Sequence, residues 1–264
     1  MRIESFFDID GRCTTNLTNK DVYKKSRKYF YINEKIISQV TEERIYNNIK
    51  KFYKLDITTK LDNFLEKIQE IKSKVALDKS LANIDKCIHI PFIIPQIKKH
   101  EDIGLDLSEI LIPSLKKAYE NRFPEYSFTN YCQDKLHGRI KILKNSRYEK
   151  LLQRLKDGEI VGILYLSLNE FSYPAAEETI TNLPKILNLA GPYEIFSSLI
   201  GVPDLLYRNE KYPPLLWMSA ITDNQEDHCS YHIEPYGYNL TFNKRSHLNQ
   251  AAEYWWHSLS ITDF

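Results

Sequence analysis

The stretch Gly158-Glu-Ile-Val-Gly-Ile-Leu-Tyr-Leu-Ser-Leu-Asn-Glu170 constrains the fold more than any other part of the chain. Its long apolar run predicts a buried strand over 159–168. A helix is expected on each side of it, over 146–157 before the strand and from Pro174 to about Leu189 after it. A buried strand between two helices predicts a sheet with helices packed against its faces.

The rest of the chain adds further helices and strands to this unit. Apolar residues at three- and four-residue spacing predict helices over 34–53 and 59–78. The apolar segment 84–95 predicts a strand away from the sheet centre, because Pro91 and Pro95 cannot donate ladder hydrogen bonds. The other expected elements are a strand pair over 126–143, a short helix within 193–207, a strand over 215–221, a strand or hairpin over 229–242, and a closing helix over 250–259.

This order of elements indicates an α+β fold, with a helical N-terminal part followed by a mixed sheet and flanking helices. We expect a mostly helical subdomain over 1–100 and a sheet-containing domain over 101–264. One continuous domain is equally compatible with the sequence, since no Gly/Ser linker marks a boundary. A doubly wound nucleotide-binding fold is disfavoured, because no Gly-x-Gly-x-x-Gly or Gly-Lys-Ser/Thr loop follows a predicted strand.

Cysteine usage and hydropathy predict a soluble, cytoplasmic protein. The four cysteines, Cys13, Cys87, Cys132 and Cys229, are scattered and include no Cys-x-x-Cys pair, so reduced thiols are expected. The N-terminus lacks the apolar core of a signal peptide. No apolar run approaches the roughly 18 residues that a membrane span requires.

The net charge of +1 conceals a split, with basic residues in excess over 1–150 and acidic residues in excess over 151–264. Such a split can mark a basic partner surface, or let the two halves attract each other. Residues 20–31 interleave Lys24, Lys25, Arg27 and Lys28 with aromatic side chains, as nucleic-acid-binding surfaces do. One hypothesis is therefore a nucleic-acid- or protein-binding module using the 20–54 face. A solvated basic helix end with tyrosines on the core explains the same pattern.

The densest polar cluster is Asp223-Asn-Gln-Glu-Asp-His-Cys-Ser-Tyr-His-Ile-Glu234. If its second half is extended, His232 and Glu234 lie on the same face of a strand. His-x-Glu with a distant histidine is typical of non-haem iron sites, and Cys or His ligands are typical of zinc. The candidate ligands for iron or zinc are His228, His232 and Glu234, with Cys229, His247 or His257 as a further ligand.

Without a metal, His232 and Glu234 can form an acid/base pair, and Cys229 can act as a nucleophile if a neighbouring histidine lowers its pKa. We interpret the cluster as an enzyme site for a small molecule or peptide, completed by the end of the 159–168 strand. This requires the strands 159–168 and 228–242 to be near neighbours. A solvated loop leading into a half-exposed strand is the other interpretation. The predicted catalytic residues are His232, Glu234, Cys229 and Glu170, and the predicted substrate-binding residues are Asn169, Tyr173, Tyr231 and Tyr236.

The segment Phe6-Phe7-Asp8-Ile9-Asp10-Gly11 resembles the nucleophile loop of the haloacid dehalogenase-like phosphatases. The resemblance implies that Asp8 attacks phosphorus and Asp10 serves as acid/base, with Asp223 and Asp227 as magnesium ligands. The chain departs from that pattern on both sides of the motif, at Glu4-Ser5 and at Arg12-Cys13. Asp-Ile-Asp-Gly is also a common turn, because Asp supplies side-chain hydrogen bonds and Gly a positive φ.

Overall fold

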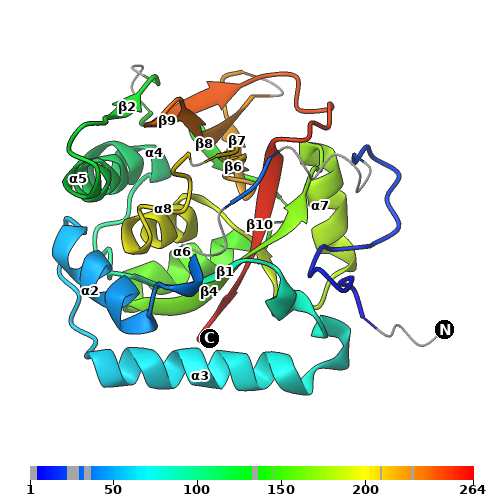
Figure 1. Cartoon of the computed structure of the whole chain (residues 1–264), viewed down its shortest axis with the longest axis horizontal. Coiled ribbons are helices and arrows are strands. Elements are labelled where there is room, and N and C mark those ends of the chain that lie inside the picture. The colour runs from blue at the N-terminus through cyan, green and yellow to red at the C-terminus, as the bar shows by residue number, and fades with distance from the viewer. Residues whose placement is uncertain are drawn as a thin grey trace.

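The computed structural model describes residues 5–22, 30–32, 37–132, 136–144, 146–208, 210–226 and 229–264. They form an α+β fold around a mixed eight-stranded sheet (Figure 1), which confirms the predicted fold class. A separate two-stranded sheet pairs β3 (Ile140–Ile142) with β7 (Ile221–Asp223), and β5 (Asn188–Leu189) joins the main sheet beside β10. The other strands lie in the order β1 (His89–Ile94), β4 (Ile160–Asn169), β10 (Trp255–Thr262), β6 (Leu215–Trp217), β8 (Ser230–Tyr236), β9 (Asn239–Arg245) and β2 (Phe128–Asn130).

Strand β4 is the predicted 159–168 strand, and every residue in it except Asn169 is buried. It pairs antiparallel with β1 on one side and with β10 on the other. Gly162 allows this close approach, because a Cβ there would lie 2.4 Å from the Phe92 ring and 2.7 Å from the Ile261 carbonyl oxygen. The Phe92 ring thus fills the space above a glycine on the neighbouring strand.

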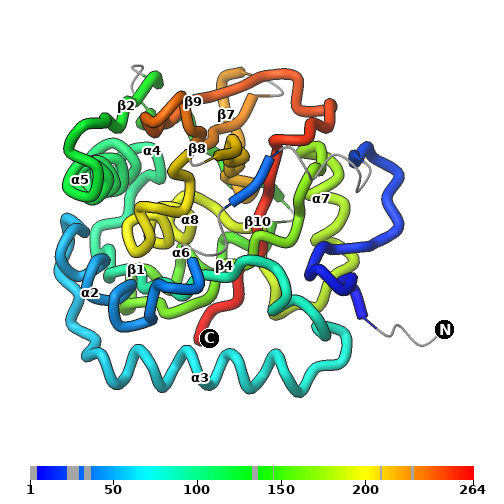
Figure 2. Tube along the Cα trace, in the orientation of Figure 1, coloured from blue at the N-terminus to red at the C-terminus, as the bar shows by residue number. Residues whose placement is uncertain are grey.

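The closing helix expected over 250–259 is wrong, because this segment leads into the strand β10. β10 pairs antiparallel with β4 and parallel with β6, and all eight of its residues are buried. Ser258 to Thr262 alternate polar and apolar residues, which is the period of a strand, and the adjacent Trp255 and Trp256 also fit a strand better than a helix. Figure 2 shows this C-terminal strand, in red, passing through the middle of the molecule.

Helix α8 (Pro192–Gly201) is the short helix expected within 193–207, and it is buried along its whole length. It lies against the sheet at β1 and β4, and α2 (Glu42–Phe52) and α5 (Ile112–Arg122) cover its other side. A helix that is buried all round needs internal partners for its polar side chains. Glu194 has them, since the Tyr148 hydroxyl and the Ser260 hydroxyl donate to its two carboxylate oxygens.

The helix predicted over 59–78 is α3 (Leu61–Leu77), which buries Phe64, Ile68, Ile71 and Val75 and lies along one side of the molecule (Figure 1). The helix predicted over 34–53 includes α2, whose Thr41 cap accepts a hydrogen bond from the Arg44 amide. Within the described ranges, no helix is both long enough and apolar enough to cross a membrane.

Two helices flank β4 in sequence, as expected: α6 (Tyr148–Asp157) and α7 (Tyr173–Asn182). Helix α7 ends well before Leu189, because Pro184 follows and restricts the residue before it. The hairpin expected over 229–242 is formed by β8 and β9, with Gly237 at a φ of +64° in the turn. The strand pair expected over 126–143 is wrong, since β2 pairs with β9 and β3 with β7.

A π-helix, Leu107–Leu111, interrupts the helical run that begins with α4 (Ile103–Asp106) and continues into α5. Pro113 lies just beyond it and cannot donate to the carbonyl of Glu109. The Lys54 ammonium donates to that carbonyl instead, at 2.7 Å. The segment that follows α2 thereby supplies the donor that Pro113 cannot provide.

The turn interpretation of Asp8–Gly11 matches the structure. Asp8 Oδ1 accepts hydrogen bonds from the Asp10 and Arg12 amides, and Gly11 has a φ of +77°. The phosphatase interpretation stays a prediction, because Asp227 is outside the described residues. None of the four cysteines, all of them described, forms a disulfide.

We expect Gly162→Ala to lower the free energy of unfolding by about 1–3 kcal/mol, because the added methyl group overpacks the contact with Phe92 and Ile261. Gly158→Ala is the matched control, since no atom lies within 4 Å of a Cβ at that position. Urea unfolding followed by circular dichroism measures both variants. Equal midpoints for Gly162→Ala and Gly158→Ala would contradict the packing described for β4.

Candidate functional site

The structure confirms that His232 and Glu234 share one face of β8. His232 Nε2 lies 3.4 Å from Glu234 Oε1, and the Arg245 guanidinium of β9 lies 3.3 Å from the other carboxylate oxygen. The His232 side chain is fully buried, whereas the Glu234 and Arg245 side chains are 20% and 33% exposed. The pair therefore reaches solvent through Glu234 and Arg245.

Burial lowers the pKa of His232 and outweighs the opposing effect of Glu234. Burial alone would raise the pKa of Glu234, but His232 and Arg245 outweigh it and hold this pKa below its usual value. The ground state of the pair is thus a neutral imidazole beside a carboxylate. This is the protonation state that a general base requires.

An aromatic cluster that includes Trp217 of β6 and His257 of β10 lies beside His232. The Trp217 ring contacts the His232 ring edge to face at 4.9 Å, and stacks on the His257 ring at 6.1 Å. Tyr173 contacts both Trp217 and His257, each at 5.8 Å. These aromatic residues form, with Leu215, Leu248 and Trp255, a second core separate from the main one.

His257 serves this second core as a structural residue. Its Nδ1 accepts a hydrogen bond from the Ser219 hydroxyl at 2.7 Å, and its Nε2 donates to the Phe171 carbonyl at 3.1 Å. Both ring nitrogens are occupied, so His257 has no lone pair to offer a metal. Burial lowers the pKa of His257 to about 3, against the weaker effect of the Phe171 hydrogen bond.

Cys229, Tyr231 and Tyr236 do not converge on His232. Cys229 is buried, and burial raises the pKa of its thiol to about 11, which disfavours a nucleophilic thiolate. The Tyr231 side chain belongs to the main core on the opposite face of β8, where its hydroxyl donates to Asp223 at 2.5 Å. Tyr236 is 70% exposed near the hairpin turn.

The predicted residues at the end of β4 are only partly brought to the cluster. β10 and β6 lie between β4 and β8, so the two strands are not near neighbours. Tyr173 nevertheless reaches β8, where the Ser230 hydroxyl donates to the Tyr173 hydroxyl at 3.2 Å. Glu170 is fully buried with a φ of +67°, and its amide donates to the Trp255 carbonyl. Asn169 lies beside it on β4 and pairs with Trp256.

Besides Asp227, two further parts of the sequence prediction fall outside the described residues. His228, a predicted metal ligand, is one of them, and so are Lys24, Lys25, Arg27 and Lys28. Over the ranges that the structure describes, no three His, Cys, Asp or Glu side chains group closely enough to hold a metal ion.

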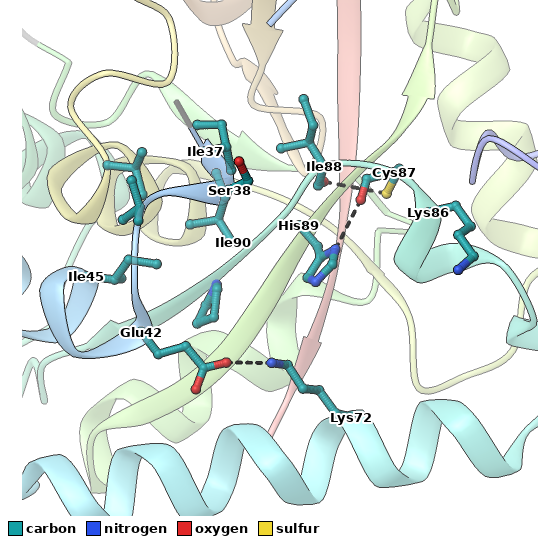
Figure 3. A pocket seen from close by; sticks show the side chains of 13 residues that line it. Ile37, Ser38, Glu42, Ile45, Lys72, Lys86, Cys87, Ile88, His89 and Ile90 are labelled. Carbon is teal, nitrogen blue, oxygen red and sulfur yellow. Dashed lines mark hydrogen bonds and ion pairs between the residues drawn. The ribbon is translucent and has the colours of Figure 1, made fainter. Parts of the chain in front are cut away.

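A cleft at the start of β1 was not predicted (Figure 3). It consists of two adjoining hollows of about 330 Å³ and 520 Å³, and the His89 and Lys72 side chains border both. Figure 3 shows the side chains that line the first hollow. We call the pair of hollows the β1 cleft. The first hollow has an apolar lining that includes Ile37, Val40, Ile45, Ile90 and Val202. An apolar hollow with a few converging polar groups is typical of a ligand site.

His89 is held in a defined orientation at the junction of the two hollows. Its Nδ1 lies 3.0 Å from the Cys87 carbonyl oxygen, and its ring stacks on Tyr165 of β4 at 5.8 Å. A carbonyl only accepts, so Nδ1 carries the proton of the neutral ring and Nε2 retains a lone pair. His89 can therefore accept a proton or a hydrogen bond from a bound molecule.

Two lysines border the first hollow with His89. The Lys72 ammonium extends from α3 and pairs with Glu42, at the start of α2, at 2.5 Å (Figure 3). Lys86 lies just before β1, and no described acidic side chain forms an ion pair with it. Among the described residues, Lys72, Lys86 and Glu42 give the border of the first hollow an excess of one positive charge, and Asp85 borders the second hollow.

The cleft borders β1, which lies at the edge of the sheet. The Leu166 amide donates to the Ile88 carbonyl. In an antiparallel pair only alternate residues of β1 form backbone hydrogen bonds with β4, so the backbone polar groups of His89 and Pro91 face away from β4. Pro91 has no N–H to leave unpaired on that side, which suits it to an edge. The signal in the sequence was a single histidine within the apolar run 84–95, which is too common a pattern to identify a site.

Comparisons with protein-family models, with curated proteins and with solved structures find no match to this chain.

The burial of neutral His257 predicts that stability falls as the pH falls. The unfolded histidine titrates near pH 6.5 and the folded one near 3, so protons favour the unfolded chain between these values. Between pH 7.5 and 5, this residue is expected to cost the wild type about 2 kcal/mol of unfolding free energy. In His257→Gln that loss is absent, which urea unfolding at the two pH values measures.

His137→Gln is the control for that experiment, because His137 is exposed in a turn and should leave the pH dependence unchanged. The buried role of His257 is refuted if His257→Gln and His137→Gln lose equal stability on acidification.

Proposed function

We propose that this protein binds a small molecule in the β1 cleft, one that combines an apolar body with an acidic group. The observation that carries the proposal is that His89 and Lys72 border both hollows. A ligand that spans the junction meets a hydrogen-bond acceptor, an ammonium group and an apolar lining within one site. In an apolar hollow, a few polar groups fix the orientation of the ligand, and the apolar lining supplies most of the affinity.

The charge of the first hollow favours an acidic ligand. Lys72 is already paired with Glu42, whereas Lys86 forms no ion pair with a described acidic side chain. A carboxylate, phosphate or sulfonate group near Lys86 would balance the excess positive charge. Because Lys86 is exposed, one such pair is worth about 1 kcal/mol at most.

His89 also equips the cleft for acid–base chemistry on the bound molecule. Its Nδ1–H is fixed on the Cys87 carbonyl, so Nε2 is the atom that would accept a proton. The acid–base activity predicted for His232 and Glu234 remains a second hypothesis, supported by the 3.4 Å contact between them. The full burial of His232 makes the β1 cleft the better supported site, since a substrate must reach the reacting nitrogen.

The probe for this proposal is 8-anilinonaphthalene-1-sulfonate, which combines an apolar ring system with an anionic group. Lys86→Met is expected to weaken its binding about two- to fivefold, because the variant removes a positive charge at an exposed position of the first hollow. Fluorescence titration at low ionic strength measures the dissociation constant. Added salt should weaken binding to the wild type more than to the variant.

Lys74→Met is the matched control, since Lys74 lies on α3, is exposed and borders neither hollow. Its affinity for the probe should equal that of the wild type. Equal affinities for Lys86→Met and Lys74→Met would show that the probe binds elsewhere and would reject the proposal.

A further inference from the structure

A second histidine is held by a carboxylate beside Tyr193 of helix α8. His100 Nδ1 lies 2.5 Å from Asp106 Oδ2, and the Tyr193 hydroxyl donates to the same oxygen at 2.5 Å. The Tyr193 oxygen also lies 3.2 Å from His100 Nδ1. The His100 and Asp106 side chains are only 9% and 6% exposed, and Tyr193 is fully buried.

The contact with Asp106 fixes the tautomer of His100. A carboxylate accepts, so the neutral ring carries its proton on Nδ1 and leaves a lone pair on Nε2. No described residue forms a hydrogen bond with Nε2. This is the arrangement in which a buried carboxylate orients a histidine that acts as a base through its other nitrogen.

His100 borders a surface hollow of about 330 Å³, and Asp106 borders a separate hollow of about 620 Å³. Each of the two side chains, His100 and Asp106, therefore borders a hollow that small molecules can approach. Glu101, Lys156 and Asp157 give the border of the smaller hollow an excess of negative charge, which disfavours an anionic substrate.

The backbone around Asp106 supports a precise placement of the pair. Asp106 ends α4, and the π-helix Leu107–Leu111 begins at the next residue. Helices of this kind are rare and are frequently found at functional sites. His100 itself lies in a turn, which is closed by a hydrogen bond from the His100 amide to the Ile97 carbonyl.

From this geometry we infer that His100 is a catalytic general base, with Asp106 and Tyr193 as its positioning residues. Its substrate is an uncharged acyl ester small enough for the hollow. Water transfers a proton to His100 Nε2 while its oxygen bonds to the acyl carbon. The bond from carbon to the leaving oxygen then breaks, and that oxygen takes the proton back from Nε2, so the products are an acid and an alcohol. This site is independent of the β1 cleft.

The hydrolysis of p-nitrophenyl acetate by the full chain tests the inference. General base catalysis contributes about 10²- to 10⁴-fold, so His100→Gln should lower kcat at least about 100-fold. Asp106→Asn should lower kcat and leave KM unchanged, because Asp106 orients the base without touching the ester. Tyr193→Phe, which keeps the ring and its packing, should lower kcat less than Asp106→Asn does.

His137→Gln is the control, since His137 is an exposed histidine that borders none of these hollows. The near-ultraviolet circular dichroism spectrum shows whether each variant is folded. The inference is overturned if a folded His100→Gln variant hydrolyses the ester as fast as His137→Gln, or if the wild type is no faster than buffer.

Diethyl pyrocarbonate provides a second test that does not depend on any variant folding. It reacts with an accessible imidazole lone pair, and peptide mass spectrometry locates the product. We expect His100 to be modified in the folded wild type, and buried His257 to remain unmodified. A folded protein in which His100 also resists the reagent would show that Nε2 is inaccessible, and would equally overturn the inference.

Discussion

The fold depends on the placement of the C-terminal strand β10 at the centre of the sheet. β10 joins β4 on one side to β6 on the other, so the strands that precede it cannot form one sheet without it. The unit β1-β4 and the unit β6-β8-β9-β2 meet only through this strand in the described sheet. Since all eight residues of β10 are buried, its apolar contacts also connect the main core with the second core around Trp217.

Because β10 is buried at the centre of the sheet, polar residues near it form hydrogen bonds that stabilise the fold. Ser219 and the Phe171 carbonyl satisfy both nitrogens of His257, and Ser260 donates to the buried Glu194 of α8. A buried polar group without a partner costs about 1–3 kcal/mol, so such hydrogen bonds decide whether the strand can occupy the centre. The histidines that retain an available ring nitrogen at a hollow, His89 and His100, lie away from β10: one begins the edge strand β1, and the other precedes α4.

Elements with strong local patterns could be predicted from the sequence. The apolar stripe of α3, the buried run of β4 and the hairpin of β8 and β9 all carry periodicity or turn signals in their own residues. β10 also alternates polar and apolar residues from Ser258 to Thr262, but the aromatic residues Tyr254, Trp255 and Trp256 around its start do not alternate, and they favoured the prediction of a helix. The partners of β2 and β3 depend on strands about 80 to 115 residues away, which no local pattern encodes.

The candidate site was predictable only in part. The His-x-Glu spacing correctly placed His232 and Glu234 on one face, but the order of strands that separates β8 from β4 is a long-range property. The β1 cleft and the pair of His100 and Asp106 were missed for a related reason. Lys72 meets His89, and Tyr193 meets Asp106, only after helices distant in sequence pack together.

Hydrogen–deuterium exchange with and without 8-anilinonaphthalene-1-sulfonate tests most directly whether ligands bind at the β1 edge rather than at the β8 cluster. We expect the probe to slow amide exchange in residues 86–91 and around Lys72, while exchange in 230–234 stays unchanged. Protection of 230–234 without protection of 86–91 would contradict this account, because it would place the ligand at His232 and Glu234.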